Sequence, residues 1–157
     1  MQTPGPKIIV LFLCTGNSCR SQMAEGWVRH LRGDAIEPYS AGIVKHGMNP
    51  HAVKVMAEAG VDISKHYFKT IEEIGPVKFD YIVTVCSHAN EHCPIVPGRT
   101  KVVHLGFDDP PQITARLPNG KEKLAVYRRV RDEIRAFVMT LPGALTGAVG
   151  GEANARR

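Results

Sequence analysis

Short apolar runs alternate along this chain with segments whose apolar residues recur every three or four positions. Four runs have the length and content of buried strands, at residues 7–13, 36–40, 79–85 and 101–105. Segments with helical spacing of apolar residues lie at residues 18–32, at 50–59 after an Asn49-Pro50 cap, at 70–74 and at 121–141. Strands that alternate with helices predict an α/β fold, a four-stranded parallel sheet with helices on both faces.

Length and composition favour a single domain. The chain has 157 residues, of which 43% are hydrophobic, enough for a core that needs no metal or disulfide. We expect the domain to span residues 1–141, because the chain becomes rich in glycine and alanine from Pro142 onward. Residues 142–157 are expected to form a mobile tail.

Charge and cysteine content limit the partners and the cellular compartment that we expect. The formal net charge is +5, but the basic residues are scattered and not interleaved with aromatic ones, so we expect no nucleic-acid partner. No apolar run approaches the roughly 20 residues of a membrane span, and the N-terminus does not read as a signal peptide. We therefore expect a cytoplasmic protein with no membrane partner, whose four cysteines rest as thiols.

The candidate chemistry begins in the loop between the first strand and the first helix, with the sequence Cys-Thr-Gly-Asn-Ser-Cys-Arg-Ser at residues 14–21. Such a turn points successive backbone N–H groups at one place, and the following helix adds a partial positive charge. The Arg20 guanidinium can then clamp two oxygens of an anion, and the same field favours the thiolate form of Cys14. Ser21 can donate a hydrogen bond to that thiolate. The loop thus predicts a sulfur nucleophile beside an oxyanion cradle, formed by Thr15, Gly16, Asn17, Ser18, Cys19 and Arg20.

Further candidate groups follow the later strands, at the same edge of the expected sheet. Cys86 and Cys93 are interpreted as a redox relay with Cys14; a metal site that adds His88 and His92, or two unrelated buried cysteines, are the alternatives. Asp109 precedes a proline, which holds it extended, and a general acid there would protonate a leaving oxygen. An ordinary Asp-Pro turn is the other interpretation.

Together these residues resemble the thioredoxin-coupled arsenate reductases, which share the low-molecular-weight protein tyrosine phosphatase fold. The matching segments are residues 14–21, 40–42, 62–66, 83–86, 93–94 and 106–110. The resemblance implies that Cys14 attacks arsenate, that Arg20 and the loop hold it, and that Asp109 protonates the departing oxygen. Cys86 would then attack Cys14 and expel arsenite, and Cys93 would attack Cys86, leaving a disulfide for thioredoxin.

The same resemblance supplies an alternative function and shows where this chain differs from its relatives. A true tyrosine phosphatase of this fold usually carries tyrosine soon after the Asp-Pro pair and lacks the relay cysteines, whereas Pro111-Gln112 follows here. No tightly bound cofactor is implied. Many relatives bind potassium near the loop, and the possible ligands are Asn17, Glu25 and Ser40, but Lys69 stands where those relatives carry an acidic residue. Either its ammonium takes the cation's place or the site is absent. His66 is expected to pack beneath the loop as a core histidine, and a role in polarising the nearby thiols is the alternative. Residues 113–119 have no explanation from the pattern.

Overall fold

The computed structural model of the protein describes residues 6–15, 19–43, 47–85, 101–118 and 120–146. Within them lies one sheet of four parallel strands in the order β2-β1-β3-β4. The strands are β1 Ile8–Leu13, β2 Ile36–Ala41, β3 Tyr81–Thr84 and β4 Lys101–His104. All four predicted strands are therefore confirmed, and so is the parallel α/β class.

Helices lie between β1 and β2, between β2 and β3, and after β4, as the apolar spacing predicted. They are α1 Arg20–Leu31, α2 Pro50–Glu58, α3 Ile71–Ile74, α4 Pro110–Thr114, α5 Gly120–Val138 and α6 Gly143–Thr146. The expected cap of α2 is present, because the Asn49 side chain accepts hydrogen bonds from the backbone N–H groups of His51 and Ala52 at 2.9 and 3.2 Å. No helix in the described part of the chain is long and apolar enough to cross a bilayer.

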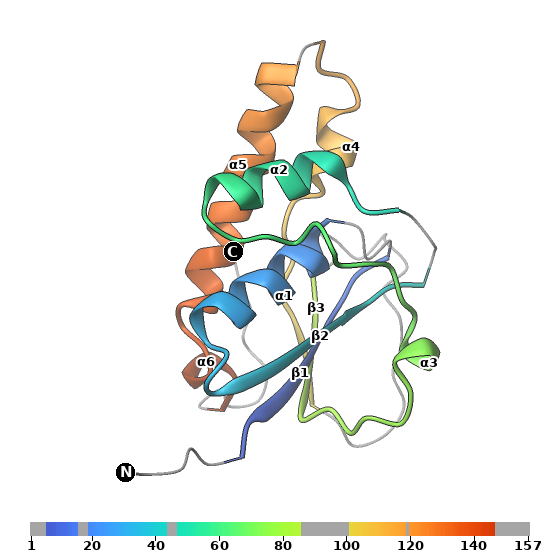
Figure 1. Ribbon diagram of the computed structural model, residues 1–157, viewed down its shortest axis with the longest axis vertical. Coiled ribbons are helices and arrows are strands. Elements are labelled where there is room, and N and C mark those ends of the chain that lie inside the picture. The colour runs from blue at the N-terminus through green and yellow to red at the C-terminus, as the bar shows by residue number, and fades with distance from the viewer. Residues whose placement is uncertain (1–5, 16–18, 44–46, 86–100, 119, 147–157) are drawn as a thin grey trace.

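Alternate residues of β1 face the two sides of the sheet, and each side has its own apolar cluster. Val10 and Phe12 belong to the larger cluster, to which α1, α2 and α5 contribute. Leu11 and Leu13 belong to a smaller one, covered in part by α3. Figure 1 shows α5 and α3 on opposite sides of the strands, so helices cover both faces.

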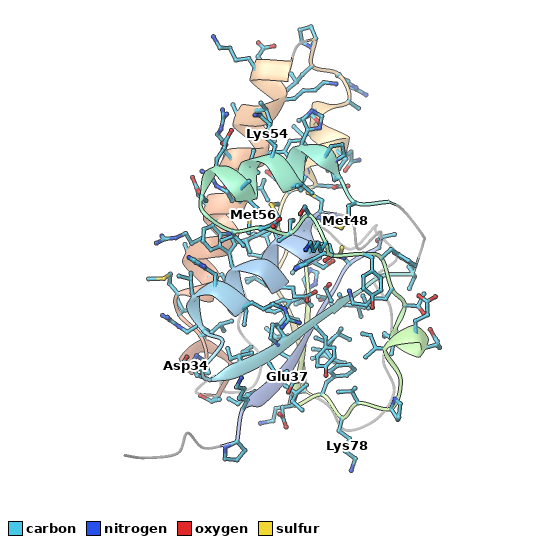
Figure 2. The ribbon with its side chains drawn as sticks, viewed as in Figure 1. Asp34, Glu37, Met48, Lys54, Met56 and Lys78 are labelled. Atoms are coloured by element: carbon cyan, nitrogen blue, oxygen red, sulfur yellow. The ribbon has the colours of Figure 1, made fainter. Side chains whose placement is uncertain are left out.

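The packing of α1 and α2 follows from their spacing. Met56 is fully buried on the inner face of α2, whereas Lys54 lies on its outer, exposed face (Figure 2). On α1, Trp27 is buried as expected of a core residue, and its indole N–H donates to the Arg131 carbonyl of α5 at 3.2 Å. Helix α1 also lies close to the segment after α2, because a Cβ at Gly26 would stand 2.7 Å from a methyl carbon of Ile63.

Two elements differ from the sequence expectations. Helix α4 was not expected, although its signal is present, since Asp109 is extended (φ −93°, ψ 102°) and Pro110 occupies the first helical position. It accounts for the start of the unexplained stretch 113–119. Residues 143–146 of the expected tail form α6, which buries Leu145, and the remainder of that expectation, residues 147–157, lies outside the described residues. Packing against the core thus continues past residue 141.

Candidate active site

Cys14 lies at the carboxyl end of the central strand β1, next to the first turn of α1. Its side chain is buried, and its sulfur lies 3.1 Å from the hydroxyl oxygen of Ser21, at hydrogen-bonding distance. The backbone N–H of Cys14 donates to the Ala41 carbonyl at 3.2 Å, and that of Ile43 donates to the Thr15 carbonyl at 2.8 Å. These bonds fix the start of the loop against the end of β2, so the sulfur has a defined position.

Arg20 connects the loop to the ends of the other strands. Its guanidinium is almost fully buried, and Nη1 donates to the carbonyl oxygens of Val85 at 3.1 Å and Phe107 at 3.0 Å. Val85 follows β3 and Phe107 follows β4. One side chain of α1 therefore bonds to backbone beyond two strands, which holds its positive charge at the edge where ligands bind in parallel α/β folds.

The expected acid also lies at this edge. Asp109 Oδ1 is 3.6 Å from Arg20 Nη2, and the Asp109 side chain is 26% exposed. Its neighbour Asp108 has turned away and pairs with Arg129 of α5 at 2.9 Å. Of the two consecutive carboxyl groups, only Asp109 is therefore placed to act on a group bound near Arg20.

Cys19, the other cysteine of the loop, is also buried. Burial raises the pKa of the Cys19 thiol, the nearby Cys14 and Asp109 raise it further, and Arg20 opposes them. A raised pKa favours the neutral thiol of Cys19, so its side chain is no second nucleophile beside Cys14.

Several predicted site residues lie outside the described part of the chain. They are Gly16, Asn17 and Ser18 of the loop and the two later cysteines, Cys86 and Cys93. The loop amides and the thiol relay consequently stay predictions. Among the described residues, no three His, Cys, Asp or Glu side chains gather as a metal site.

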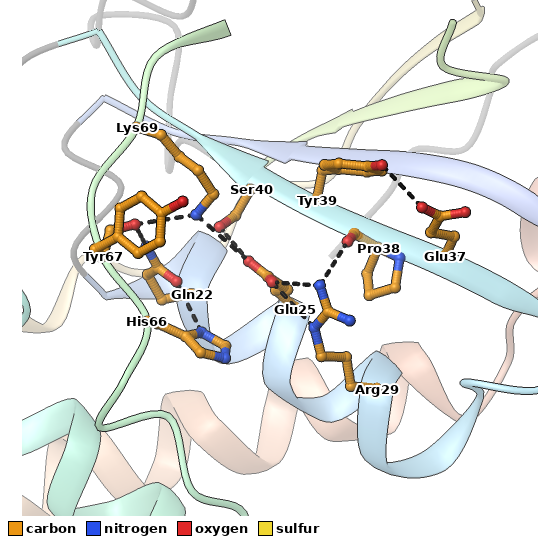
Figure 3. Close-up of polar contacts among 10 residues, drawn as sticks. All are labelled: Gln22, Glu25, Arg29, Glu37, Pro38, Tyr39, Ser40, His66, Tyr67 and Lys69. Carbon is orange, nitrogen blue, oxygen red and sulfur yellow. Dashed lines mark hydrogen bonds and ion pairs between the residues drawn. The ribbon is translucent and has the colours of Figure 1, made fainter. Parts of the chain in front are cut away.

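A second polar cluster lies behind the loop, around Glu25 of α1 (Figure 3). Glu25 Oε1 accepts the Ser40 hydroxyl at 2.6 Å, and Oε2 accepts two hydrogen bonds from Arg29 at 3.0 and 3.1 Å. His66 is half-buried and not a core residue, and its Nδ1 lies 2.9 Å from Gln22 Oε1. Sequence reasoning singled out Glu25 and Ser40 but missed Gln22 and Arg29, although a Glu and an Arg four residues apart on a helix are a recognisable pair.

Comparisons with known proteins agree with this geometry. The family profile described as "Low molecular weight phosphotyrosine protein phosphatase" matches residues 9–147. The chain is 51% identical over 134 residues to an arsenate reductase of Halalkalibacterium halodurans, covering 85% of this chain and 94% of the relative. It is 49% identical over 126 residues to an arsenate reductase of Bacillus subtilis, covering 80% and 88%.

Solved structures give the same result. The arsenate reductase from Archaeoglobus fulgidus is similar with a TM-score of 0.68 and 31% identity, over 85% of this chain and 98% of that one. A low molecular weight protein tyrosine phosphatase from T. tengcongensis is similar with a TM-score of 0.63 and 27% identity, over 86% and 97%. The chain therefore belongs to the low molecular weight phosphotyrosine protein phosphatase family, and within it to the arsenate reductases.

Proposed function

We propose that this protein reduces arsenate to arsenite, using three cysteines as a thiol relay that thioredoxin regenerates. The observation that carries the proposal is the buried Cys14 beside Ser21, Arg20 and Asp109, in a chain that is 51% identical to a protein named arsenate reductase. That Cys86 and Cys93 are both present in the sequence favours reduction over hydrolysis.

In the first step, arsenate binds in the loop and Cys14 attacks it. The Arg20 guanidinium and the loop N–H groups hold the oxyanion, while the Ser21 hydroxyl, 3.1 Å from the sulfur, stabilises the thiolate. A sulfur–arsenic bond forms and an arsenic–oxygen bond breaks. Asp109 supplies the proton with which that oxygen leaves as water.

Reduction follows in the second step, which needs another thiol. The Cys86 thiolate attacks the Cys14 sulfur, so that a disulfide forms, the sulfur–arsenic bond breaks and its electron pair stays on arsenic. Arsenic passes from the +5 to the +3 state and leaves as arsenite. Cys93 then attacks Cys86, which releases the Cys14 thiolate and leaves a Cys86–Cys93 disulfide.

The third step regenerates the thiols. A dithiol protein such as thioredoxin exchanges with the Cys86–Cys93 disulfide and takes over the two oxidising equivalents. This cycle suits the reducing cytoplasm, where thiols rest reduced and disulfides are transient. The thioredoxin-dependent arsenate reductase from Corynebacterium glutamicum is similar to this chain in fold, with a TM-score of 0.56.

The decisive experiment is arsenate-dependent NADPH oxidation with purified protein, thioredoxin and thioredoxin reductase. We expect turnover with the wild type and none with Cys14→Ser. Cys86→Ser should also lose arsenate reduction but keep slow hydrolysis of an aryl phosphate, because hydrolysis needs only the loop and the acid. Arsenate reduction that persists in Cys14→Ser would overturn the mechanism, and loss of both reactions in Cys86→Ser would overturn the relay.

The alternative function is a protein tyrosine phosphatase. It is favoured by the structural likeness to the T. tengcongensis enzyme, since Cys14, Arg20 and Asp109 would serve both reactions. The same assays separate the two, because a phosphatase hydrolyses aryl phosphates rapidly and oxidises no NADPH in response to arsenate.

A further inference from the structure

Glu25 is a buried carboxylate whose two oxygens are both occupied. It lies on α1 with only 5% of its surface exposed, where a carboxylate is stable only if its charge is compensated. Oε2 receives the two N–H groups of Arg29, and Oε1 receives the Ser40 hydroxyl. The Lys69 ammonium lies 4.0 Å from the same Oε1, as Figure 3 shows.

Lys69 is held in this position by its own backbone and side chain. Its carbonyl accepts the N–H of Gly42, just beyond β2, at 2.9 Å, and its ammonium donates to the Tyr67 carbonyl at 3.0 Å. The ammonium also lies 4.7 Å from the centre of the Tyr67 ring, within cation–π range. Burial lowers the pKa of Lys69 and the Glu25 carboxylate opposes this shift.

These contacts bear on the potassium ion that the family resemblance implies. A surface hollow of about 570 Å³ is lined by Glu25, Tyr67 and Lys69, so a small ion from solvent has a path to the carboxylate. Once there it would find Oε1 engaged with Ser40 and an ammonium within about 4 Å. Like charges at that distance repel strongly in a partly buried site. The residues present therefore do not fit a bound monovalent cation.

We propose that the Lys69 ammonium is the built-in counter-cation of Glu25, and that it replaces a soluble monovalent cation in this protein. Lys69 is a positioning residue in this role, because it acts on α1 through the Glu25 carboxylate. It joins the 66–70 segment to α1 at Glu25, about one turn beyond Arg20 and Ser21. Gln22 adds a second connection, since its amide N–H donates to the Tyr67 carbonyl at 3.0 Å. The inference holds whichever oxyanion the loop takes.

The test compares unfolding temperatures in potassium chloride and in tetramethylammonium chloride at equal ionic strength, where only potassium is small enough to enter. The wild type should unfold at the same temperature in both salts. Lys69→Met, which keeps the length of the side chain but removes its charge, should unfold about 5 °C lower in tetramethylammonium and recover part of that loss in potassium. Lys69→Asp should show a larger recovery, because it adds a second carboxylate to the place an ion would occupy.

Lys65→Met is the matched control. Lys65 is exposed and lines the same hollow, so its loss changes the net charge equally without changing the counter-ion of Glu25. It should respond to neither salt. Specific stabilisation of the wild type by potassium would overturn the proposal, and so would a Lys69→Met protein that is neither destabilised nor sensitive to potassium. Arsenate turnover of the wild type should likewise be equal in the two salts.

Discussion

Helix α1 carries two buried charges five positions apart, and they are compensated in opposite ways. Arg20 is 4% exposed and Glu25 is 5% exposed. Arg20 donates to two neutral backbone carbonyls and lies 3.6 Å from Asp109, at the open edge of the sheet. Glu25 is surrounded by two cationic side chains and a hydroxyl, away from the loop.

The difference shows how a single helix supplies both chemistry and stability. Carbonyl oxygens orient a guanidinium without cancelling its charge, and the pair with the partly exposed Asp109 is long at 3.6 Å. Much of the charge of Arg20 therefore still acts on an anion that enters the loop. Cationic partners compensate the charge of Glu25, so we expect the second cluster mainly to join α1 to β2 and to the 66–70 segment. Substitutions in the first region should therefore affect activity, and those in the second should affect stability.

Arg20→Ala should have the largest effect. Turnover with arsenate should fall below detection, by about 10³-fold or more, because the side chain that holds the doubly charged oxyanion is gone. Steady-state assays well below the unfolding temperature of the variant measure this. Arg29→Ala is the matched control, since Arg29 pairs with Glu25 and should keep most of the activity. Comparable losses in both variants would contradict the division between the regions.

Asp109→Asn should lower kcat by roughly 10²–10⁴, the usual contribution of general acid catalysis. The unfolding temperature should change little, because the side chain is partly exposed and its pair with Arg20 is long at 3.6 Å. Asp108→Asn provides the control, since that carboxyl pairs with Arg129 instead. If Asp108→Asn were the slower enzyme, the acid would have been assigned to the wrong residue.

Glu25→Gln should cost about 3 kcal/mol of unfolding free energy, because it leaves Arg29 and Lys69 without the carboxylate that compensates them. Urea titration measures this loss. We expect kcat at low temperature to stay within about threefold of the wild type, because the bonds that hold Arg20 come from Val85 and Phe107 and not from Glu25. In the control, Glu58→Gln removes a more exposed pair with Arg128 and should leave the unfolding midpoint nearly unchanged. Equal midpoints for Glu25→Gln and the wild type would refute a stabilising role for the cluster.

His66 should give the smallest effect, visible only as a pH dependence. Burial lowers its pKa in the folded protein from the usual 6.5, and Lys69 and Arg29 lower it further against the attraction of Glu25. The unfolded chain therefore binds a proton that the folded one does not, so stability is complete above about pH 6.5 and declines as the pH falls below it. Between about pH 7.5 and about 5.5, the unfolding free energy should fall less steeply in His66→Gln than in the wild type. The difference between the two proteins should change by under about 1 kcal/mol over this range. Identical slopes would show that His66 titrates normally.

The sequence by itself determined most of the fold and the identity of the chemical groups. Strands and helices were recovered because apolar period and caps such as Asn49-Pro50 are local signals. The candidate nucleophile and clamp were recognised because Cys14 and Arg20 share the loop that follows the first strand. The candidate acid was recognised because Asp109 follows the fourth strand, and parallel strands bring such ends together. Helix α4 was missed because it is only five residues long and offers little periodicity.

Tertiary structure alone decided which of these groups meet and which are neutralised. The proline after Asp109 favoured that residue over Asp108 as the acid. Only the fold shows that Asp109 lies 3.6 Å from Arg20, while Asp108 pairs with Arg129, twenty-one residues further along. In the same way, the sequence could not show that Lys69 and Glu25 lie 4.0 Å apart. The two residues are separated by forty-four positions, and their distance depends on how the 66–70 segment packs across α1. Apolar pattern and spacing report on a turn of helix or a short strand. The groups that compensate a charge are those that the fold brings within a few ångströms of it, and their identity depends on the packing of the whole chain.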